Sequence, residues 1–168
     1  WRSISGFVTH DGFIFNDTIE RNIALGDETP DNEWVRECCE IANINDFVNT
    51  LPNGLETIIG TEGVGISQGQ KQRILIARAL YKKPKFLFLD EATNSLDVNN
   101  ETEILNKLKT HIADKTVIVI AHRLSTIRDA DQILILNEGK VIEKGTHQEL
   151  VFQKGHYWEL VEKQMMEV

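Results

Sequence analysis

The sequence predicts an α/β protein with a mostly parallel β-sheet and a helix-rich subdomain beside it. Two apolar runs, residues 86–89 and 116–121, are continuous, which is typical of parallel strands covered on both faces. An amphipathic stretch over 99–112 lies between them, and this alternation of strand and helix indicates an α/β layer fold. Residues 18–81 are rich in predicted helices and therefore form the expected subdomain.

The first half of the chain predicts one strand followed by helices. A short apolar strand over 5–8 ends in a polar turn. Thr18 lies near the start of the helix expected at 18–24. Pro30 lies where the first turn of the helix at 31–42 tolerates a proline, and Pro84 follows the end of the helix at 68–81. The expected helices cover residues 18–24, 31–42, 46–51 and 68–81.

The second half contains the two apolar strands, the helix between them and a group of shorter elements. A helix over 124–130 follows the second strand. Residues 133–136 and 141–143 predict two strands joined by a hairpin turn. Two helices, over 146–152 and 156–165, complete the pattern.

Composition places the chain among ordinary soluble globular domains. Its 168 residues suit one domain, with 41% hydrophobic and 26% charged residues. The net charge of −8 argues against nucleic acid as the main partner, because phosphate backbones are bound by clustered Lys and Arg. No apolar run is long enough to span a bilayer. The chain begins at Trp1, so we expect a piece of a longer polypeptide, and this absence does not exclude a membrane protein.

Two carboxylates, Asp90 and Glu91, directly follow the apolar run 86–89. They therefore lie at the carboxyl end of a buried strand, which is the edge where open α/β sheets bind ligands. An Asp at this edge can hold Mg²⁺, and an adjacent Glu can polarise an attacking water. The alternative is that the two acids cap the next helix.

A histidine occupies the corresponding place after the neighbouring strand. His122 follows the run 116–121 as Asp90 follows its own strand, so both side chains can face one crevice. An imidazole there could hydrogen-bond a γ-phosphate. The alternative is a structural histidine at a strand end.

The helix over 68–81 opens with a polar sequence, Ser67-Gln68-Gly69-Gln70. A helix N-terminus offers unpaired amides and a partial positive charge, both suited to an anion. Ser67 adds a hydroxyl donor, and Gly69 lets the backbone approach closely. The alternative is an ordinary N-cap by Ser67.

The order of these motifs resembles that of the ATP-binding cassette (ABC) ATPases, and the resemblance covers essentially the whole chain. The matching segments are 66–70 (signature), 86–91 (Walker B), 95–97 (D-loop), 121–123 (switch histidine), and the exporter-like stretches 13–19 and 60–65. No Gly-x-x-x-x-Gly-Lys-Ser/Thr phosphate loop, the Walker A motif, occurs in the 168 residues.

This resemblance implies a P-loop NTPase-like layered fold that lacks its N-terminal strands and phosphate loop. Residues 13–83 would form the helical and signature subdomain, and residues 84–168 the core from Walker B onward. The implied activity is ATP hydrolysis with Mg²⁺ at a dimer interface, coupled to export. The implied partners are a transmembrane domain fused upstream and a second ABC ATPase domain in a homodimer, on the cytoplasmic face of the cell membrane.

The resemblance assigns three residues to the nucleotide that this subunit would hold itself. Asp90 would serve Mg²⁺, Glu91 would be the general base, and His122 would hold the γ-phosphate. The Walker A loop is expected upstream of Trp1. We therefore expect residues 1–168 alone to be inactive.

Other matched residues would serve the opposite subunit. Ser67, Gly69 and Gln70 belong to the signature and would bind the nucleotide held by the partner. Asp97 would link the two sites across the dimer.

Two residues depart from the family pattern. Gln68 replaces the first glycine of the signature, but Ser67 and Gly69, which would make most of the contacts, are both present. His10 stands where the Q-loop glutamine, which helps to bind Mg²⁺ and senses the transmembrane partner, is expected. A neutral imidazole can ligate metal with one acceptor nitrogen, and its protonation could make coupling pH-sensitive.

Two alternatives stay open. DNA-repair and chromosome-structuring ATPases carry a similar signature, but they usually have a long coiled coil between the early motifs and the signature. Only a short helical stretch, with no sustained heptad, separates His10 from Ser67. The chain can also be a folded fragment with no nucleotide binding of its own. In this family, specificity for the transported substrate would belong to the membrane segments.

Overall fold

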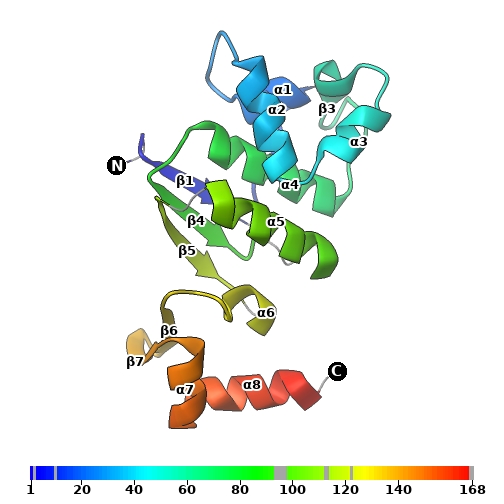
Figure 1. The fold of residues 1–168 in the computed structure, drawn as a ribbon. Coiled ribbons are helices and arrows are strands. Elements are labelled where there is room, and N and C mark those ends of the chain that lie inside the picture. Colours follow the sequence, from blue (N-terminus) through cyan, green and yellow to red (C-terminus); the bar gives the residue numbers. More distant parts are fainter. Residues whose placement is uncertain (2, 10, 93–97, 112–113, 122, 167–168) are drawn as a thin grey trace. The chain divides into compact units, whose positions relative to one another are not determined.

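The computed structural model describes the chain except for residues 2, 10, 93–97, 112–113, 122 and 167–168, and it describes residues 98–102 and 125 by their backbone only. Two compact units, Trp1–Ile120 and Ala121–Val168, make up the described chain (Figure 1). Each unit has its own core and is described by itself. The predicted subdivision near residue 83 stays a prediction.

The first unit combines a parallel sheet with helices, which confirms the predicted α/β class (Figure 1). Strand β4 lies in the centre of the sheet and pairs in parallel with β1 on one side and β5 on the other. The elements of this unit are β1 (Ser5–Val8), β2 (Asp17–Thr18), α1 (Ile19–Ile23), α2 (Asn32–Ile41), α3 (Asn45–Thr50), the 3-10 helix η1 (Gly54–Glu56), β3 (Ile58–Ile59), α4 (Gln68–Tyr81), β4 (Phe86–Asp90), α5 (Val98–His111) and β5 (Thr116–Ile120).

The sheet is covered on one face within this unit. Leu87 and Leu89 point to the covered face and are buried in the same core as Ile104 of α5 and the apolar residues of α4. Alternate residues point the other way, and Phe7 and Ile120 are each 55% exposed. The prediction that these strands are covered on both faces is therefore wrong within this unit, because the helices α4 and α5 both pack against the same side.

Aromatic side chains line the open face of the sheet. The rings of Phe7 and Phe88 stack with centroids 4.6 Å apart, and the ring of Trp1 lies 5.1 Å from that of Phe86. Phe7 and Phe88 are directly opposite each other in the register of β1 and β4. These contacts shield part of the apolar surface through side chains of the sheet itself.

Helix α4 is the central helix of the first unit. Its bounds coincide with the predicted ones, and apolar residues are buried around most of its circumference, as expected for a core helix. Gly6 allows β1 to approach it closely, because a Cβ at this position would lie 3.0 Å from the Ala79 carbonyl oxygen. Lys83, in the left-handed conformation, and Pro84 then end the helix.

A buried amide fastens the segment before α1 to the rest of the unit. Asn22 is fully buried, and its Oδ1 accepts hydrogen bonds from the Phe15 amide (2.9 Å) and from Arg78 (2.9 Å). Its Nδ2 donates to the carbonyl oxygens of Phe15, Asp17 and Thr18 at 3.0–3.3 Å. One side chain therefore pairs four polar groups of an irregular segment and connects them to α4.

Arg78 completes this network from α4. Its guanidinium donates to the carbonyl oxygens of Asn22 (2.6 Å) and Phe13 (2.7 Å), and it lies 5.5 Å above the centroid of the Phe15 ring. Burial lowers the pKa of Arg78 to about 10, so the side chain stays protonated at neutral pH.

Helix α2 buries one face, which contains Val35, Cys38, Cys39 and Ile41. Asp31 is its N-cap and accepts a hydrogen bond from the Trp34 amide, so Pro30 precedes the cap and does not lie in the first turn. Cys38 and Cys39 are both buried free thiols, and burial raises the pKa of each to about 12. Neither thiol is therefore a reactive thiolate at neutral pH.

In the residues that the structure describes, the second unit consists of a hairpin and three helices. Strands β6 (Ile133–Asn137) and β7 (Lys140–Gly145) are antiparallel, and both turn residues, Glu138 and Gly139, have positive φ, as a type I′ turn requires. Helices α6 (Leu124–Ile127), α7 (His147–Gln153) and α8 (His156–Met166) accompany the hairpin. Its small core contains Ile133, Leu150, Tyr157 and Val161. Among the described helices of both units, none is long and apolar enough to cross a membrane.

Replacing Asn22 by alanine is expected to lower the free energy of unfolding by about 3 kcal/mol, because several buried polar groups lose their partner at once. Chemical denaturation measures this change. Asn49→Ala, at an exposed position of α3, is the matched control and should change stability by less than about 0.5 kcal/mol. Equal stability of the two variants would contradict the structural role of Asn22.

Candidate functional site

The three parallel strands end at the same edge of the sheet. Because β1, β4 and β5 run in parallel and in register, their last residues, Val8, Asp90 and Ile120, lie at one edge. Asp90 is directly opposite Ile120, and its side chain is exposed. The predicted position of Asp90 at the carboxyl end of a strand is therefore observed.

Glu91 follows Asp90 in an unusual backbone conformation. Its φ is +50°, in the left-handed region, which costs a non-glycine residue about 1–2 kcal/mol. Its amide donates a hydrogen bond of 3.1 Å to the carbonyl oxygen of Ile120, so the backbone is fixed to β5 at this point. Left-handed non-glycine residues also occur at helix ends and in the hairpin turn of this chain, but Glu91 follows a strand at the ligand-binding edge of a parallel sheet, and strained conformations cluster at such sites.

A second group of predicted residues lies at the start of α4. Ser67 is the N-cap, and its Oγ accepts a hydrogen bond of 3.2 Å from the Gln70 amide. The Gln70 side chain in turn accepts one of 2.8 Å from the Ser67 amide, which completes a capping box. The N-cap alternative is thus observed. It does not compete with anion binding, because the box leaves the amides of Gln68 and Gly69 outside it.

The structure places the described site residues in two groups on different elements. Asp90 and Glu91 lie at the end of β4, and Ser67, Gly69 and Gln70 lie at the start of α4 (Figure 1). The remaining predicted site residues, His10, Asp97 and His122, lie outside the described residues.

The donor set at the sheet edge fits a hard cation. The exposed carboxylate of Asp90 is an oxygen ligand of the kind that Mg²⁺ prefers, and Mg²⁺ commonly uses only one or two protein carboxylates. Within the described ranges, no three His, Cys, Asp or Glu side chains gather as a metal-binding group. The described residues therefore fit a magnesium ion that is shared with substrate phosphates and do not fit an all-protein metal centre.

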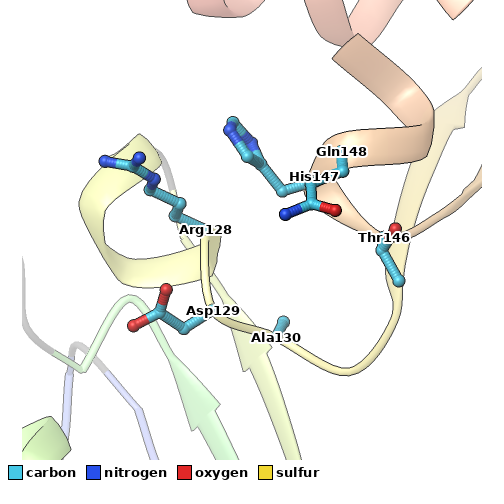
Figure 2. Close-up of a pocket in the computed structure, with 6 residues that line it drawn as sticks. All are labelled: Arg128, Asp129, Ala130, Thr146, His147 and Gln148. Carbon is cyan, nitrogen blue, oxygen red and sulfur yellow. The ribbon is translucent and has the colours of Figure 1, made fainter. Parts of the chain in front are cut away.

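The second unit contains a separate hollow of about 410 Å³. Figure 2 shows that its lining residues come from two segments, Arg128–Ala130 after α6 and Thr146–Gln148 at the start of α7. His147 Nδ1 lies 2.7 Å from the buried Tyr157 hydroxyl, so this imidazole is held by the core of the unit. Of the predicted site residues that the structure describes, none lines the hollow.

Comparison with known proteins gives the family. The family model described as "ABC transporter" matches residues 1–94, more than half of the chain. The chain is 46% identical over 99% of its length to "Multidrug resistance protein 4" of Entamoeba histolytica, and 44% identical over 97% to "P-glycoprotein 14" of Caenorhabditis elegans. The chain belongs to the ABC transporter family.

A solved structure confirms the fold. The described chain superposes on the structure of a bacterial Atm1-family ABC exporter with ATP bound, with a TM-score of 0.92 and 41% identity over 98% of this chain. The mixed α/β fold is thus that of the nucleotide-binding domain of an ABC exporter. The chain spans 29% of that exporter chain and only 13% and 12% of the two curated relatives.

Two features of the first unit were not predicted from the sequence. Asn22 interrupts the apolar face formed by Ile19 and Ile23, and a polar residue at such a position is a signal for a buried hydrogen-bonding role. The left-handed conformation of Glu91 has no comparable signal, because Gly and Asn are the residues that favour it.

Replacing Glu91 by glycine is expected to raise the free energy of unfolding by about 0.5–1 kcal/mol, because glycine adopts a positive φ without steric cost. Denaturant unfolding measures the change. Lys82→Gly is the control: Lys82 has φ −70°, so glycine there should destabilise by a similar amount. A loss of stability in both variants would mean that Glu91 is not strained.

Proposed function

We propose that this chain is the C-terminal portion of the ATP-hydrolysing domain of an ABC exporter, which couples ATP binding and hydrolysis at a dimer interface to transmembrane export. Residues 13–83 form its helical and signature part, and residues 84–168 its core from the Walker B strand onward. The observation that carries the proposal is the pair Asp90–Glu91 at the carboxyl end of a parallel strand, within a chain of this family.

Glu91 is the general base for the nucleotide bound by the same subunit. Its backbone is held at Ile120 in a conformation that the chain maintains at a cost, which pre-organises the carboxylate before substrate arrives. Asp90 would hold Mg²⁺, which would supply positive charge to the phosphates of ATP. His122 binds the γ-phosphate, and His10 takes the place of the Q-loop glutamine.

The start of α4 serves the nucleotide of a partner subunit. The hydroxyl of Ser67 and the amide of Gly69, at the positive end of a 14-residue helix, are suited to a γ-phosphate. Gln70 acts through Ser67, because its side chain is bonded to the Ser67 amide. Asp97 connects the two sites of the dimer.

The partners follow from the same assignment. The complete transporter also contains a transmembrane domain, fused upstream of this chain, and a second ABC ATPase domain. The ATPase domains act on the cytoplasmic face of the cell membrane. The relatives named above, which include a multidrug resistance protein and an ABC exporter with ATP bound, support this assignment.

The central test is the replacement of Glu91 by glutamine in the purified full-length transporter. Removal of a general base is expected to lower kcat for ATP hydrolysis by at least about 100-fold while Mg-ATP binding is retained. Glu33→Gln, at an exposed position of α2, is the matched control and should leave kcat unchanged. An unchanged hydrolysis rate in the Glu91 variant would overturn the proposed role.

Residues 1–168 alone are expected not to bind Mg-ATP at micromolar concentration, because they contain no phosphate loop to hold the α- and β-phosphates. Isothermal titration calorimetry of the isolated chain tests this, with the full-length transporter as the positive control. Micromolar affinity in the isolated chain would show that the described residues form a complete site by themselves.

A further inference from the structure

Two segments that lie far apart in the sequence meet at a reciprocal pair of hydrogen bonds. The side-chain amide of Asn16 donates to a carboxylate oxygen of Glu62 (3.1 Å), and the backbone amide of Glu62 donates to Asn16 Oδ1 (3.2 Å). The asparagine amide supplies both the donor and the acceptor that this reciprocal pair needs, whereas a carboxylate in its place would supply only the acceptor.

The reciprocal pair extends the small antiparallel sheet of β2 and β3. These strands pair over two residues each, Asn16 directly precedes β2, and Glu62 follows β3 after a short loop. Gly60 brings the two backbones together: its φ is +113°, and a Cβ at this position would lie 2.9 Å from the Asn16 Cα. The two segments are therefore in backbone contact beside the reciprocal pair.

The loop that contains Glu62 leads directly into the start of α4. The Val64 amide donates a hydrogen bond of 2.9 Å to the carbonyl oxygen of Ile58, so the loop turns back onto β3. Ile66 then packs against the core, and Ser67 follows it as the N-cap of α4. The position of Ser67 therefore depends on how this loop is held.

The other side of the reciprocal pair is tied to the same helix. Phe15, which precedes Asn16, is bonded through its amide and its carbonyl oxygen to the buried side chain of Asn22. The Asn22 side chain also accepts a hydrogen bond from Arg78 of α4. The contacts thus form a closed circuit, which runs from the start of α4 through the loop and the reciprocal pair back to a later turn of the same helix.

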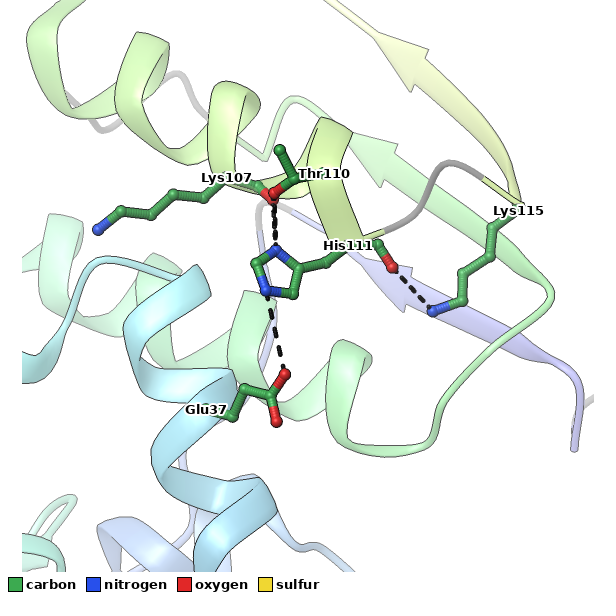
Figure 3. A network of polar contacts seen from close by, with 5 residues as sticks. All are labelled: Glu37, Lys107, Thr110, His111 and Lys115. Atoms are coloured by element: carbon green, nitrogen blue, oxygen red, sulfur yellow. Dashed lines mark hydrogen bonds and ion pairs between the residues drawn. The ribbon is translucent and has the colours of Figure 1, made fainter.

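A single ion pair on the surface provides no such attachment. Figure 3 shows the imidazole of His111, on α5, facing Glu37 of α2; the distance is 4.0 Å and both side chains are about half exposed, so this contact contributes little. The reciprocal pair is also exposed, but it has two hydrogen bonds, and a backbone amide donates one of them. It therefore fixes the backbone of the loop as well as a side chain.

We propose that Asn16 and Glu62 are positioning residues: their reciprocal pair holds the loop before α4, so that Ser67 keeps the orientation in which it meets the γ-phosphate of a nucleotide held by the partner subunit. The effect on the nucleotide rests on the proposed function of Ser67, whereas the attachment of the loop does not. Neither Asn16 nor Glu62 contacts the nucleotide in this role.

The test begins with Asn16→Asp in the full-length transporter. The new carboxylate cannot donate a hydrogen bond and lies opposite the carboxylate of Glu62, so the like charges repel each other. We expect faster hydrogen–deuterium exchange of the Val64 amide in the nucleotide-free transporter, because the loop is released.

Closure of the two nucleotide-binding domains, measured by pulsed electron paramagnetic resonance between spin labels, gives the functional readout. In Asn16→Asp, the ATP concentration for half-maximal closure should rise about 5- to 10-fold, because a charge-assisted hydrogen bond is lost. The affinity for Mg-ADP, which lacks the γ-phosphate, should change by less than about 2-fold, since Ser67 makes no contact with it.

Exchanging the two functional groups separates positioning from a general loss of stability. In Asn16→Asp/Glu62→Gln, the new side-chain amide donates to the new carboxylate, so both hydrogen bonds return with the charge on the other segment. Exchange and closure should then come within about 2-fold of the wild-type values. Glu62→Gln alone should also stay within about 2-fold, because its side-chain oxygen still accepts from Asn16. Asn49→Asp, which adds the same charge at an exposed position of α3, should change neither readout.

The outcomes distinguish this role from the proposed function. An unchanged exchange rate or closure concentration in Asn16→Asp, an equal shift in Asn49→Asp, a parallel loss of Mg-ADP affinity, or no recovery in Asn16→Asp/Glu62→Gln would overturn the positioning role and leave the proposed function standing. A wild-type transporter that does not close with ATP would overturn the proposed function, and with it the effect of the reciprocal pair on the nucleotide.

Discussion

The hydrogen bonds between Asn22 and Arg78 are the constraint on which the first unit depends. A guanidinium is costly to bury unless each donor direction finds an acceptor. Each of the three nitrogens of Arg78 donates one hydrogen bond, to the carbonyl oxygens of Asn22 and Phe13 and to the amide oxygen of Asn22, and the guanidinium lies over the Phe15 ring. The irregular segment before α1, the helix α1 itself and the central helix α4 are therefore held as one body.

This attachment explains how α4 can be both the core helix of the unit and a helix with an accessible N-terminal end. Most of the helix is buried and holds the sheet and the helices α1 and α2 together, while its first residue positions and its N-cap stay accessible. The helix is thus anchored along its length and presents only its N-terminal end. Asn43 adds a connection to α5, since its carbonyl oxygen accepts a hydrogen bond from Arg73 of α4 and its side chain accepts one from Lys107 of α5.

Patterns with several independent signals were predicted well, and features of single residues were not. The bounds of α4 follow from the polar opening at Ser67, the apolar positions and Pro84, and all three agree. The open face of the sheet was missed because residues 86–89 are all apolar, so the sequence contains no alternation that would show which side is covered. The strands β2 and β3 were also missed, because two residues each are too few to show an alternation of apolar and polar side chains.

The same distinction applies to the candidate site: positions set by neighbouring residues were predicted, and a conformation set by a distant residue was not. Asp90 and Ser67 were placed correctly because a strand end and a helix start are both set by neighbouring residues. The conformation of Glu91 depends on its bond to Ile120, about thirty residues away in the chain, and no local pattern encodes it.

The open aromatic face has a colloidal consequence for the isolated chain. Copies with a net charge of −8 repel one another over about 30 Å at 0.01 M salt, but over only about 8 Å at 0.15 M. Salt does not weaken the attraction between apolar rings such as those of Phe7 and Phe88. Buffers of moderate ionic strength therefore bring these faces together, and dilute buffers keep the copies apart.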